Sequence, residues 1–118
     1  MKRVMIFIAV LVMLGSPVAN ATKANFTANV TRTLIADDGK YGGCMVMLDT
    51  SIQAQLPECP STNWVTLSCS GDFSAKDIAY RKFDSAQMAK ALKVKISLRV
   101  DDLRKHNGFC YAERLDVW

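Results

Sequence analysis

Four cysteines constrain the fold of this chain more than any other feature of its sequence. They lie at Cys44, Cys59, Cys69 and Cys110, and no two of them form a Cys-x-x-Cys pair. An even number of cysteines in a short exported chain is typical of disulfides, which stabilise a core that is otherwise marginal. Zinc sites need closer cysteines or several histidines, and His106 is the only histidine. We therefore expect two disulfides, no free thiol and no metal.

The N-terminal segment has the pattern of a secretory signal peptide. Two basic residues precede an apolar run over residues 4–14, and Ala19-Asn20-Ala21 offers a cleavage site with small side chains. The run is shorter than the roughly 20 residues that span a bilayer. We expect a signal peptide over residues 1–21, a single domain over residues 22–118, no membrane span, and a periplasmic or secreted location.

The charge balance argues against nucleic acid as a partner. The chain has 15 Lys and Arg against 11 Asp and Glu, a formal charge of +4 that falls to +2 without Lys2 and Arg3. Acidic and basic residues are interspersed in the rest of the sequence, so no basic stripe is available to neutralise phosphates. We expect no nucleic-acid partner.

The sequence predicts five β-strands, of which the first, fourth and fifth alternate apolar with polar residues. The strands are expected over residues 26–34, 44–48, 64–69, 94–100 and 109–117. Glycines and aspartates over residues 37–43 predict a turn that joins the first two strands as a hairpin. Asn107-Gly108 predicts a second hairpin turn, at the end of a charged connection over residues 101–108.

One helix is expected between the third and fourth strands. Ser74 with Asp77 and Asp84 with Gln87 both resemble capping boxes, so the helix can begin at either place. The second place is favoured because good helix formers follow it, and it predicts a short helix over residues 85–92.

The order of these elements is that of an OB-fold, a five-stranded barrel whose helix lies between strands three and four. Barrel closure also removes the two exposed edges that an open sheet would present. The expected fold is therefore mainly β with one short helix, an OB-fold-like barrel in the order β-β-β-α-β-β. The alternative is a small α+β sandwich with the helix packed on one face.

An OB-fold barrel favours one of the three possible disulfide pairings. Its second and third strands are antiparallel neighbours, which brings Cys44 opposite Cys69. Its third and fifth strands are parallel, which brings Cys59, in a loop over residues 49–63, near Cys110. The main rival joins Cys59 to Cys69 and Cys44 to Cys110.

The layout of the chain resembles the OB-fold binding subunits of bacterial AB5 toxins, in particular the subtilase-cytotoxin and typhoid-toxin-like group. The matching features are, in order, Cys44, Cys59, Trp64, a helix, and the strand Val94-Lys95-Ile96-Ser97-Leu98. The resemblance implies glycan binding and pentamer formation. The chain departs from the pattern at Cys69 and in the turn over residues 105–108, so no sugar-contacting residue is carried over.

No catalytic constellation is evident in the sequence. His106 has no partner fixed by the sequence, and its place beside a hairpin turn favours an exposed structural histidine over a general base. Asp37-Asp38 and Asp101-Asp102 lack the regular oxygen donors of a calcium loop, so we interpret them as solvated turns. We expect no enzymatic activity and no cofactor.

The remaining candidates form a binding surface. On OB-fold barrels, ligands meet the exposed face of strands two and three and the two hairpin connections. The candidate ligand-binding residues are Asp38, Tyr41, Trp64, Arg104, Lys105, His106 and Asn107, with Met45 and Met47 on the second strand. Tyr41 and Trp64 suit stacking on a sugar or anchoring of a protein partner. The alternatives are burial of Trp64 beside the disulfides and of the two methionines in the core.

Two functions of different classes fit these features. The first is an exported, non-enzymatic binding module, similar to a toxin B subunit, that recognises a glycan or a protein and forms a homo-oligomer. The second is a periplasmic immunity or inhibitor protein that blocks a secreted cell-wall-degrading effector by inserting the loop Arg104-Lys105-His106 into its cleft. A third, less specific alternative is a structural envelope protein.

Overall fold

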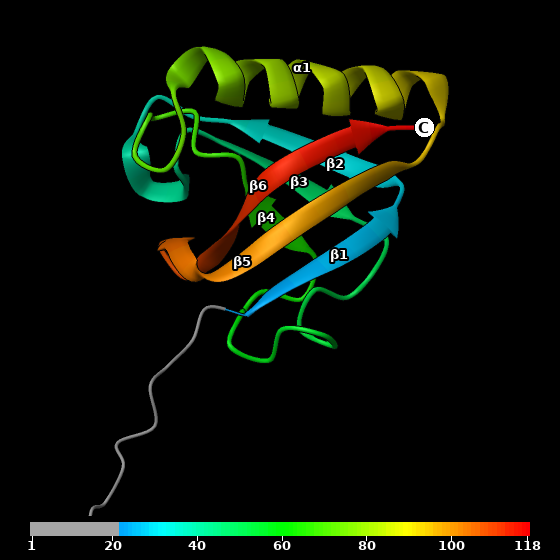
Figure 1. Cartoon of the computed structure of the whole chain (residues 1–118). Coiled ribbons are helices and arrows are strands. Elements are labelled where there is room, and N and C mark those ends of the chain that lie inside the picture. The colour runs from blue at the N-terminus through cyan, green and yellow to red at the C-terminus, as the bar shows by residue number, and fades with distance from the viewer. Residues whose placement is uncertain (1–21) are drawn as a thin grey trace, which may run out of the picture.

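The computed structural model describes residues 22–118, so the predicted signal peptide lies outside the described residues. This part of the chain is mainly β with one α-helix (Figure 1). Its elements are β1 (Lys23–Ala28), β2 (Val30–Ile35), the 3-10 helix η1 (Gly39–Tyr41), β3 (Cys44–Leu48), β4 (Trp64–Thr66), α1 (Lys76–Leu92), β5 (Ile96–His106) and β6 (Phe109–Val117).

The strands form one six-stranded mixed sheet in the order β1-β5-β6-β4-β3-β2. All neighbours are antiparallel except β4 and β6, which are parallel and pair at Thr66 and Tyr111. Helix α1 lies across one side of the sheet and contacts β2, β3 and β6 (Figure 1). The loop over residues 49–63 lies at the opposite end and adds the fully buried Ile52 and Leu56 to the core.

The expected count of five strands was wrong, because the first predicted strand is divided at Asn29. The segment before Asn29 pairs with β5 as β1, and the segment after it pairs with β3 as β2. Asn29 bonds Asp49 instead of a strand: its backbone N–H donates to Asp49 Oδ1 at 2.8 Å and its amide to Asp49 Oδ2 at 2.9 Å. β1 and β2 are therefore the two edges of the sheet, and among the described residues no ladder joins them, so the sheet is not closed into the expected barrel.

Helix α1 is longer than the predicted helix over residues 85–92. It begins after Ala75, which offers no side-chain cap, and neither predicted capping box starts it. One side of the helix is buried from Ala79 to Ala89, and it is apolar except for Lys82. Burial of this apolar side against the sheet stabilises the early turns that local capping does not.

Strand β5 continues beyond the predicted end at Val100. Residues 101–106, expected in a connection, belong to this strand. Asp101 pairs with both β1 and β6, and Lys105 and His106 pair with β6. A register shift between Asp101 and Lys105 accommodates the extra residues. The predicted hairpin turn is confirmed, with Asn107 at φ 50° and Gly108 at φ 86°.

The favoured disulfide pairing is confirmed. Cys44 bonds Cys69 and Cys59 bonds Cys110, with Cα–Cα distances of 5.5 and 5.8 Å. The described residues contain no free cysteine. The first disulfide joins β3 to the segment after β4, and the second ties the loop over residues 49–63 to β6.

Candidate ligand-binding site

A surface hollow of about 160 Å³ gathers apolar side chains from four strands and η1. It is lined by Leu34 of β2, Tyr41 of η1, Met45 of β3, Trp64 of β4 and Phe109 of β6. We call it the aromatic hollow. Its wall is ordered: the rings of Tyr41 and Phe109 meet edge to face with centroids 5.6 Å apart. In such a pair the edge of one ring packs on a face of the other, which holds both side chains in place.

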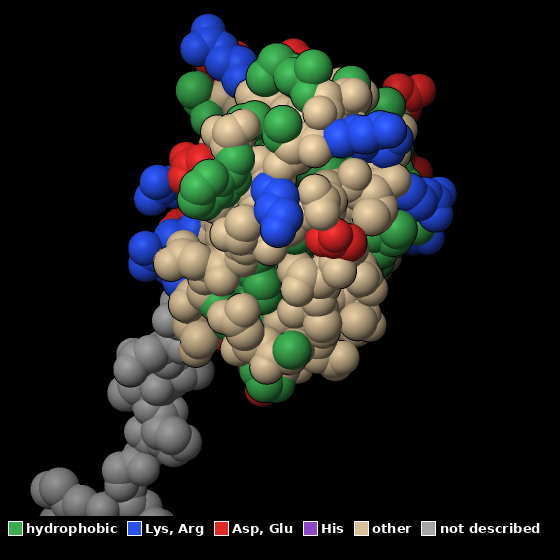
Figure 2. Space-filling view, turned by 90° about the vertical axis from the view of Figure 1, so that its right-hand side faces the viewer, with side chains coloured by type: hydrophobic (Ala, Val, Ile, Leu, Met, Phe, Trp, Pro, Cys, Tyr) green, Lys and Arg blue, Asp and Glu red, His purple; other side chains and the backbone are tan. Residues whose placement is uncertain are grey.

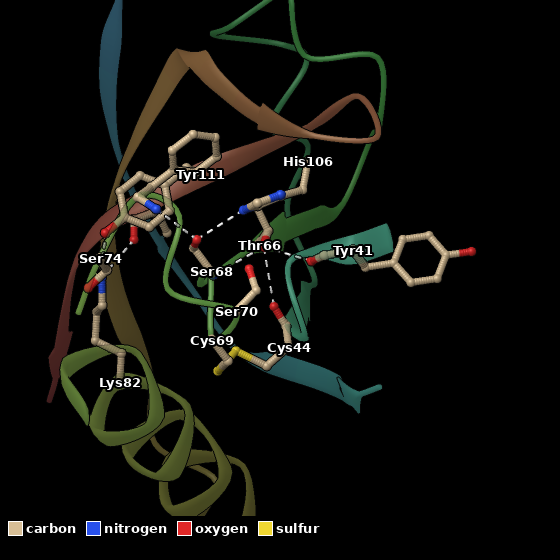
Figure 3. Close-up of a disulfide and its surroundings, with 12 residues drawn as sticks. Tyr41, Cys44, Thr66, Ser68, Cys69, Ser70, Ser74, Lys82, His106 and Tyr111 are labelled. Carbon is tan, nitrogen blue, oxygen red and sulfur yellow. Dashed lines mark hydrogen bonds between the residues drawn. A yellow bond between two sulfur atoms is a disulfide. The ribbon is translucent and has the colours of Figure 1, made fainter. Parts of the chain in front are cut away.

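The η1 turn presents Tyr41 to this hollow. Asp38 caps the turn by accepting a hydrogen bond from the Lys40 N–H at 3.3 Å, and Thr66 Oγ1 donates to the Tyr41 carbonyl at 2.8 Å. Gly42 has φ 74°, and a Cβ there would lie 2.5 Å from both the His106 ring and Thr66 Oγ1. The turn thus packs tightly against β4 and β5, and the Tyr41 ring points away from the Cys44–Cys69 disulfide (Figure 3).

A cation lies beside the aromatic hollow. The guanidinium carbon of Arg32 is 5.5 Å from the centroid of the Trp64 ring, within the range of a cation–π contact. Trp64 is half-buried, so it is neither sequestered in the core nor fully solvated. Arg32 does not line the hollow itself, and it lies beside the hollow through this contact with Trp64.

A second hollow, of about 350 Å³, adjoins the first through Phe109. It is lined by Pro60, Ser61, Thr62, Asn107, Gly108 and Phe109, and we call it the polar hollow. The Cys59–Cys110 disulfide holds its two walls together, because it ties the loop before Pro60 to the start of β6. The arrangement places hydroxyl and amide groups next to an aromatic surface.

Three predicted site residues meet at these hollows. Tyr41 and Trp64 line the aromatic hollow and Asn107 lines the polar one. Met45 contributes to the aromatic hollow although it is buried, whereas Met47 is half-buried and is not among its lining residues.

The other predicted site residues make contacts within the protein. Asp38 caps η1, and Lys105 Nζ donates to the Glu58 carbonyl at 2.7 Å. Arg104 bonds the carboxylates of Asp101 and Glu113, each at 2.8 Å. Their side chains stabilise the turn and the β5–β6 hairpin.

His106 is half-buried, contrary to the expectation of an exposed histidine. Its side chain is 11% exposed, its Nε2 lies 2.9 Å from Ser68 Oγ, and its ring packs 4.5 Å from that of Phe73 (Figure 3). Burial lowers the pKa of His106, and Asp72, 3.7 Å from Nε2, partly offsets this effect. Ser68 is fully buried, so a substrate has no access to its hydroxyl in this structure.

Asp101 and Asp102 are also buried, at 4% and 7% exposure, so their interpretation as a solvated turn was wrong. Burial alone would raise the pKa of Asp101, but the Leu103 N–H and Arg104 more than compensate and lower it. Glu113 shares Arg104 with Asp101 and also forms ion pairs with Lys23 and Arg99. These cations lower the pKa of Glu113. The hydrogen bond from Lys23 is the largest influence, and the charges of Arg104 and Arg99 add to it.

Sequence reasoning missed three residues of the site: Leu34, Phe109 and Arg32. Leu34 and Phe109 belong to alternating strands, where an apolar residue that faces a surface hollow has the same pattern as one that faces the core. Arg32 was missed because its contact with Trp64 joins two strands that are distant in sequence. The only available indication for Phe109 was its position directly after the Asn107-Gly108 turn, which brings it to the exposed tip of a hairpin.

No protein-family model, curated protein sequence or solved structure matches this chain. Within residues 22–118, no group of three or more His, Cys, Asp or Glu side chains could hold a metal ion. In the same part of the chain, no helix is long and apolar enough to cross a membrane.

Proposed function

We propose that the chain is an exported binding module that recognises a glycan through the aromatic and polar hollows. The observation that carries this proposal is the convergence of Tyr41, Trp64 and Phe109 on one surface hollow, from segments distant in sequence. The apolar face of a sugar ring stacks on aromatic side chains. The hydroxyl and amide groups of Ser61, Thr62 and Asn107 are within the adjoining hollow, where they suit the hydroxyls of the next sugar.

The dimensions of the site support a small or chain-end ligand. The two hollows together reach the few hundred cubic ångströms typical of small-ligand sites. A charged polymer is disfavoured, because acidic and basic residues are interspersed in the sequence. On the one face seen in Figure 2, Lys and Arg side chains are likewise scattered among other residues.

The proposal includes an OB-fold. In this interpretation β1 and β2 act as one first strand, bent at Asn29, that pairs with β5 before the bend and with β3 after it. The parallel pairing of β4 with β6 and the position of α1 between β4 and β5 fit the same topology. The hollows then lie on the face and hairpin connections where OB-folds bind oligosaccharides.

We further propose that the protein forms a homo-oligomer, as the resemblance to toxin B subunits implies. Several large apolar side chains on the outer side of α1 are exposed, among them Ile78, Met88 and Leu92. Several copies of one weak sugar site would raise the avidity for a surface that displays many glycans. Light scattering coupled to size exclusion tests this: a single species with the mass of one chain contradicts it.

Two disulfides are consistent with an oxidising compartment outside the cytoplasm.

The alternative function, an inhibitor that inserts Arg104-Lys105-His106, gains no support from the geometry. Arg104 and Lys105 are engaged with Asp101, Glu113 and Glu58, and His106 points inward. We therefore favour glycan recognition.

Fluorescence titration tests the proposed site. The chain has two tryptophans, so a Trp118→Phe background makes Trp64 the only reporter. We expect a panel of soluble oligosaccharides to include one that changes Trp64 emission. Tyr41→Ala and Phe109→Ala should each weaken that binding about tenfold, the equivalent of one lost aromatic contact.

Tyr80→Ala is the matched control, because Tyr80 is an exposed aromatic residue on α1 outside both hollows. It should bind as tightly as the parent. The site assignment fails if Tyr41→Ala and Phe109→Ala fold and bind like the parent. If no oligosaccharide binds but a protein partner does so in a Phe109-dependent manner, the hollows are a protein-binding site and the glycan proposal is wrong.

A further inference from the structure

The backbone nitrogen of Thr22 is held against a buried carboxylate. Its N–H donates to Asp102 Oδ1 at 2.9 Å, and the Asp102 N–H donates back to the Thr22 carbonyl at 3.1 Å. This reciprocal pair extends the β1–β5 ladder by one residue beyond Lys23 and Asp101. The position of the Thr22 nitrogen is therefore fixed by main-chain pairing as well as by the carboxylate.

Asp102 lacks a cationic partner in the described part of the chain. It is 7% exposed, yet no Lys, Arg or His side chain of residues 22–118 forms an ion pair with it. The nearby cations are committed elsewhere: Lys23 and Arg104 bond Glu113, and Arg104 also bonds Asp101. A buried carboxylate whose side chain meets only an amide N–H is a costly arrangement.

We propose that the chain is cut between Ala21 and Thr22, and that the new α-ammonium of Thr22 forms an ion pair with Asp102. The three residues before the cut, Ala19-Asn20-Ala21, suit a peptidase that accepts small side chains. The contact between Thr22 and Asp102 is independent evidence for the same bond, because it places a carboxylate where the cut creates a positive charge. The inference does not depend on glycan recognition.

The chemistry of the step is hydrolysis of one peptide bond. The C–N bond between Ala21 and Thr22 breaks, the water oxygen bonds the Ala21 carbonyl carbon, and both water protons end on the Thr22 nitrogen. The leaving segment carries a carboxylate, and Thr22 carries an ammonium with three N–H groups. One of these already points at Asp102 Oδ1, so a hydrogen bond from a neutral amide to the carboxylate becomes an ion pair without movement of the strand.

The ion pair would anchor an edge strand. β1 contributes Phe26 and Ala28 to the core, each 3% exposed, and its outer edge has no neighbouring strand. Fixing its first residue to β5 keeps these side chains packed. Processing therefore completes the fold: the cut chain is more stable than the same residues with a peptide bond at the Thr22 nitrogen.

The test begins with the full chain exported from a bacterial host. Intact-mass measurement and N-terminal sequencing of the purified protein should show Thr22 as the first residue and two disulfides. A second chain carries one serine inserted between Ala21 and Thr22. The insertion keeps the cleavage site and residues 22–118, but it moves the ammonium one residue away from Asp102.

The insertion variant should unfold at a lower temperature than the parent, by about 5 °C, the shift expected for loss of one partly buried ion pair in a domain of this size. Asp102→Asn should lower the melting temperature of the parent more than that of the insertion variant. Asp116→Asn is the control, because Asp116 is exposed and pairs with Arg114, so its effect should be equal in both chains.

Three results overturn the proposal. The first is a purified protein that begins at any other residue. The second is an insertion variant that melts at the parent's temperature. The third is an Asp102→Asn effect of equal size in both chains. If Asp102→Asn does not fold, the comparison of parent and insertion variant still decides the question.

Discussion

The imidazole Nε2 of His106 lies 2.9 Å from the hydroxyl oxygen of Ser68, and this contact joins the end of β5 to the segment that follows β4. Ser68 has a positive φ of 60°, and its hydroxyl also accepts a hydrogen bond from the Phe73 N–H at 3.1 Å. The side chain of one strand residue thus organises the connection that leads into α1.

This contact predicts that stability decreases in mildly acidic solution. Burial lowers the pKa of His106 below its ordinary value of 6.5, so the unfolded chain binds a proton more readily than the folded one. The free energy of unfolding is therefore greatest above pH 6.5 and falls as the pH drops through 6.5 towards the lower folded-state pKa. Thermal unfolding between about pH 7.5 and pH 5 should show this loss.

A His106→Gln variant is the control for this prediction. Its free energy of unfolding should change less with pH over the same range, because the titrating imidazole is gone. The pKa values of Asp49, Asp101 and Glu113 are also lowered, but their contributions are lost only at more acidic pH. Parallel pH profiles of parent and variant would contradict the assignment to His106.

The two disulfides should both contribute substantially to stability. They close loops with sequence separations of 25 and 51 residues, for which chain entropy gives about 3.5 and 4 kcal/mol. Replacing Cys44 and Cys69 together, or Cys59 and Cys110 together, by serine should lower the free energy of unfolding by about these amounts. Denaturant titration measures the loss, and a decrease below about 1 kcal/mol for either pair would count against a structural role.

The uncapped start of α1 offers a stabilising substitution. Ala75 is the N-cap and its side chain accepts no hydrogen bond from the first turn. Ala75→Asp should raise the free energy of unfolding by about 1 kcal/mol, because the carboxylate caps free N–H groups and meets the positive end of the helix dipole. Ala91→Asp, at an exposed position in the last turn, should lower it. Equal effects of the two substitutions would show that the cap position is assigned wrongly.

The beginning of β5 should not tolerate a charge. Ile96 is fully buried, so Ile96→Asp places an unpaired carboxylate in the core, at a cost of several kcal/mol that a small domain does not withstand. Leu103→Asp is the matched control, because Leu103 lies in the same strand but is 58% exposed. Circular dichroism should show an unfolded Ile96→Asp chain and a folded Leu103→Asp chain. A cooperative Ile96→Asp protein would contradict the strand assignment.

Period-two alternation located β6 and the first part of β5, because one face of each is apolar along most of its length. It also detected the segment over residues 26–34, but alternation does not say which strand is the neighbour. The exchange of partners at Asn29 depends on Asp49, a residue from another segment, so it was invisible locally. The helix start failed for the same reason: burial of Phe83 against the sheet outweighs the local capping pattern.

The charged end of β5 shows how distant partners change the meaning of a sequence. Asp101 and Asp102 look like turn residues on their own, yet Arg104 and the Thr22 nitrogen allow both to be buried. At the candidate site, Tyr41 and Trp64 were predictable because aromatic residues beside turns and strand ends are unusual in solvent. Phe109 was not predictable as a site residue, because an apolar residue at its position in β6 is also expected in a strand with one face buried in the core.

The division of the first strand at Asn29 has a consequence for the order of folding. β2 pairs with β3 across the short η1 turn, whereas Lys23 of β1 pairs with Asp101 across most of the chain. Closing the longer loop costs about 2 kcal/mol more chain entropy, so the β2–β3 hairpin should nucleate early and β1 should dock last. In a chain that crosses a membrane N-terminus first, the leading strand must wait for residues that emerge near the end. In such a chain, folding is completed only after translocation.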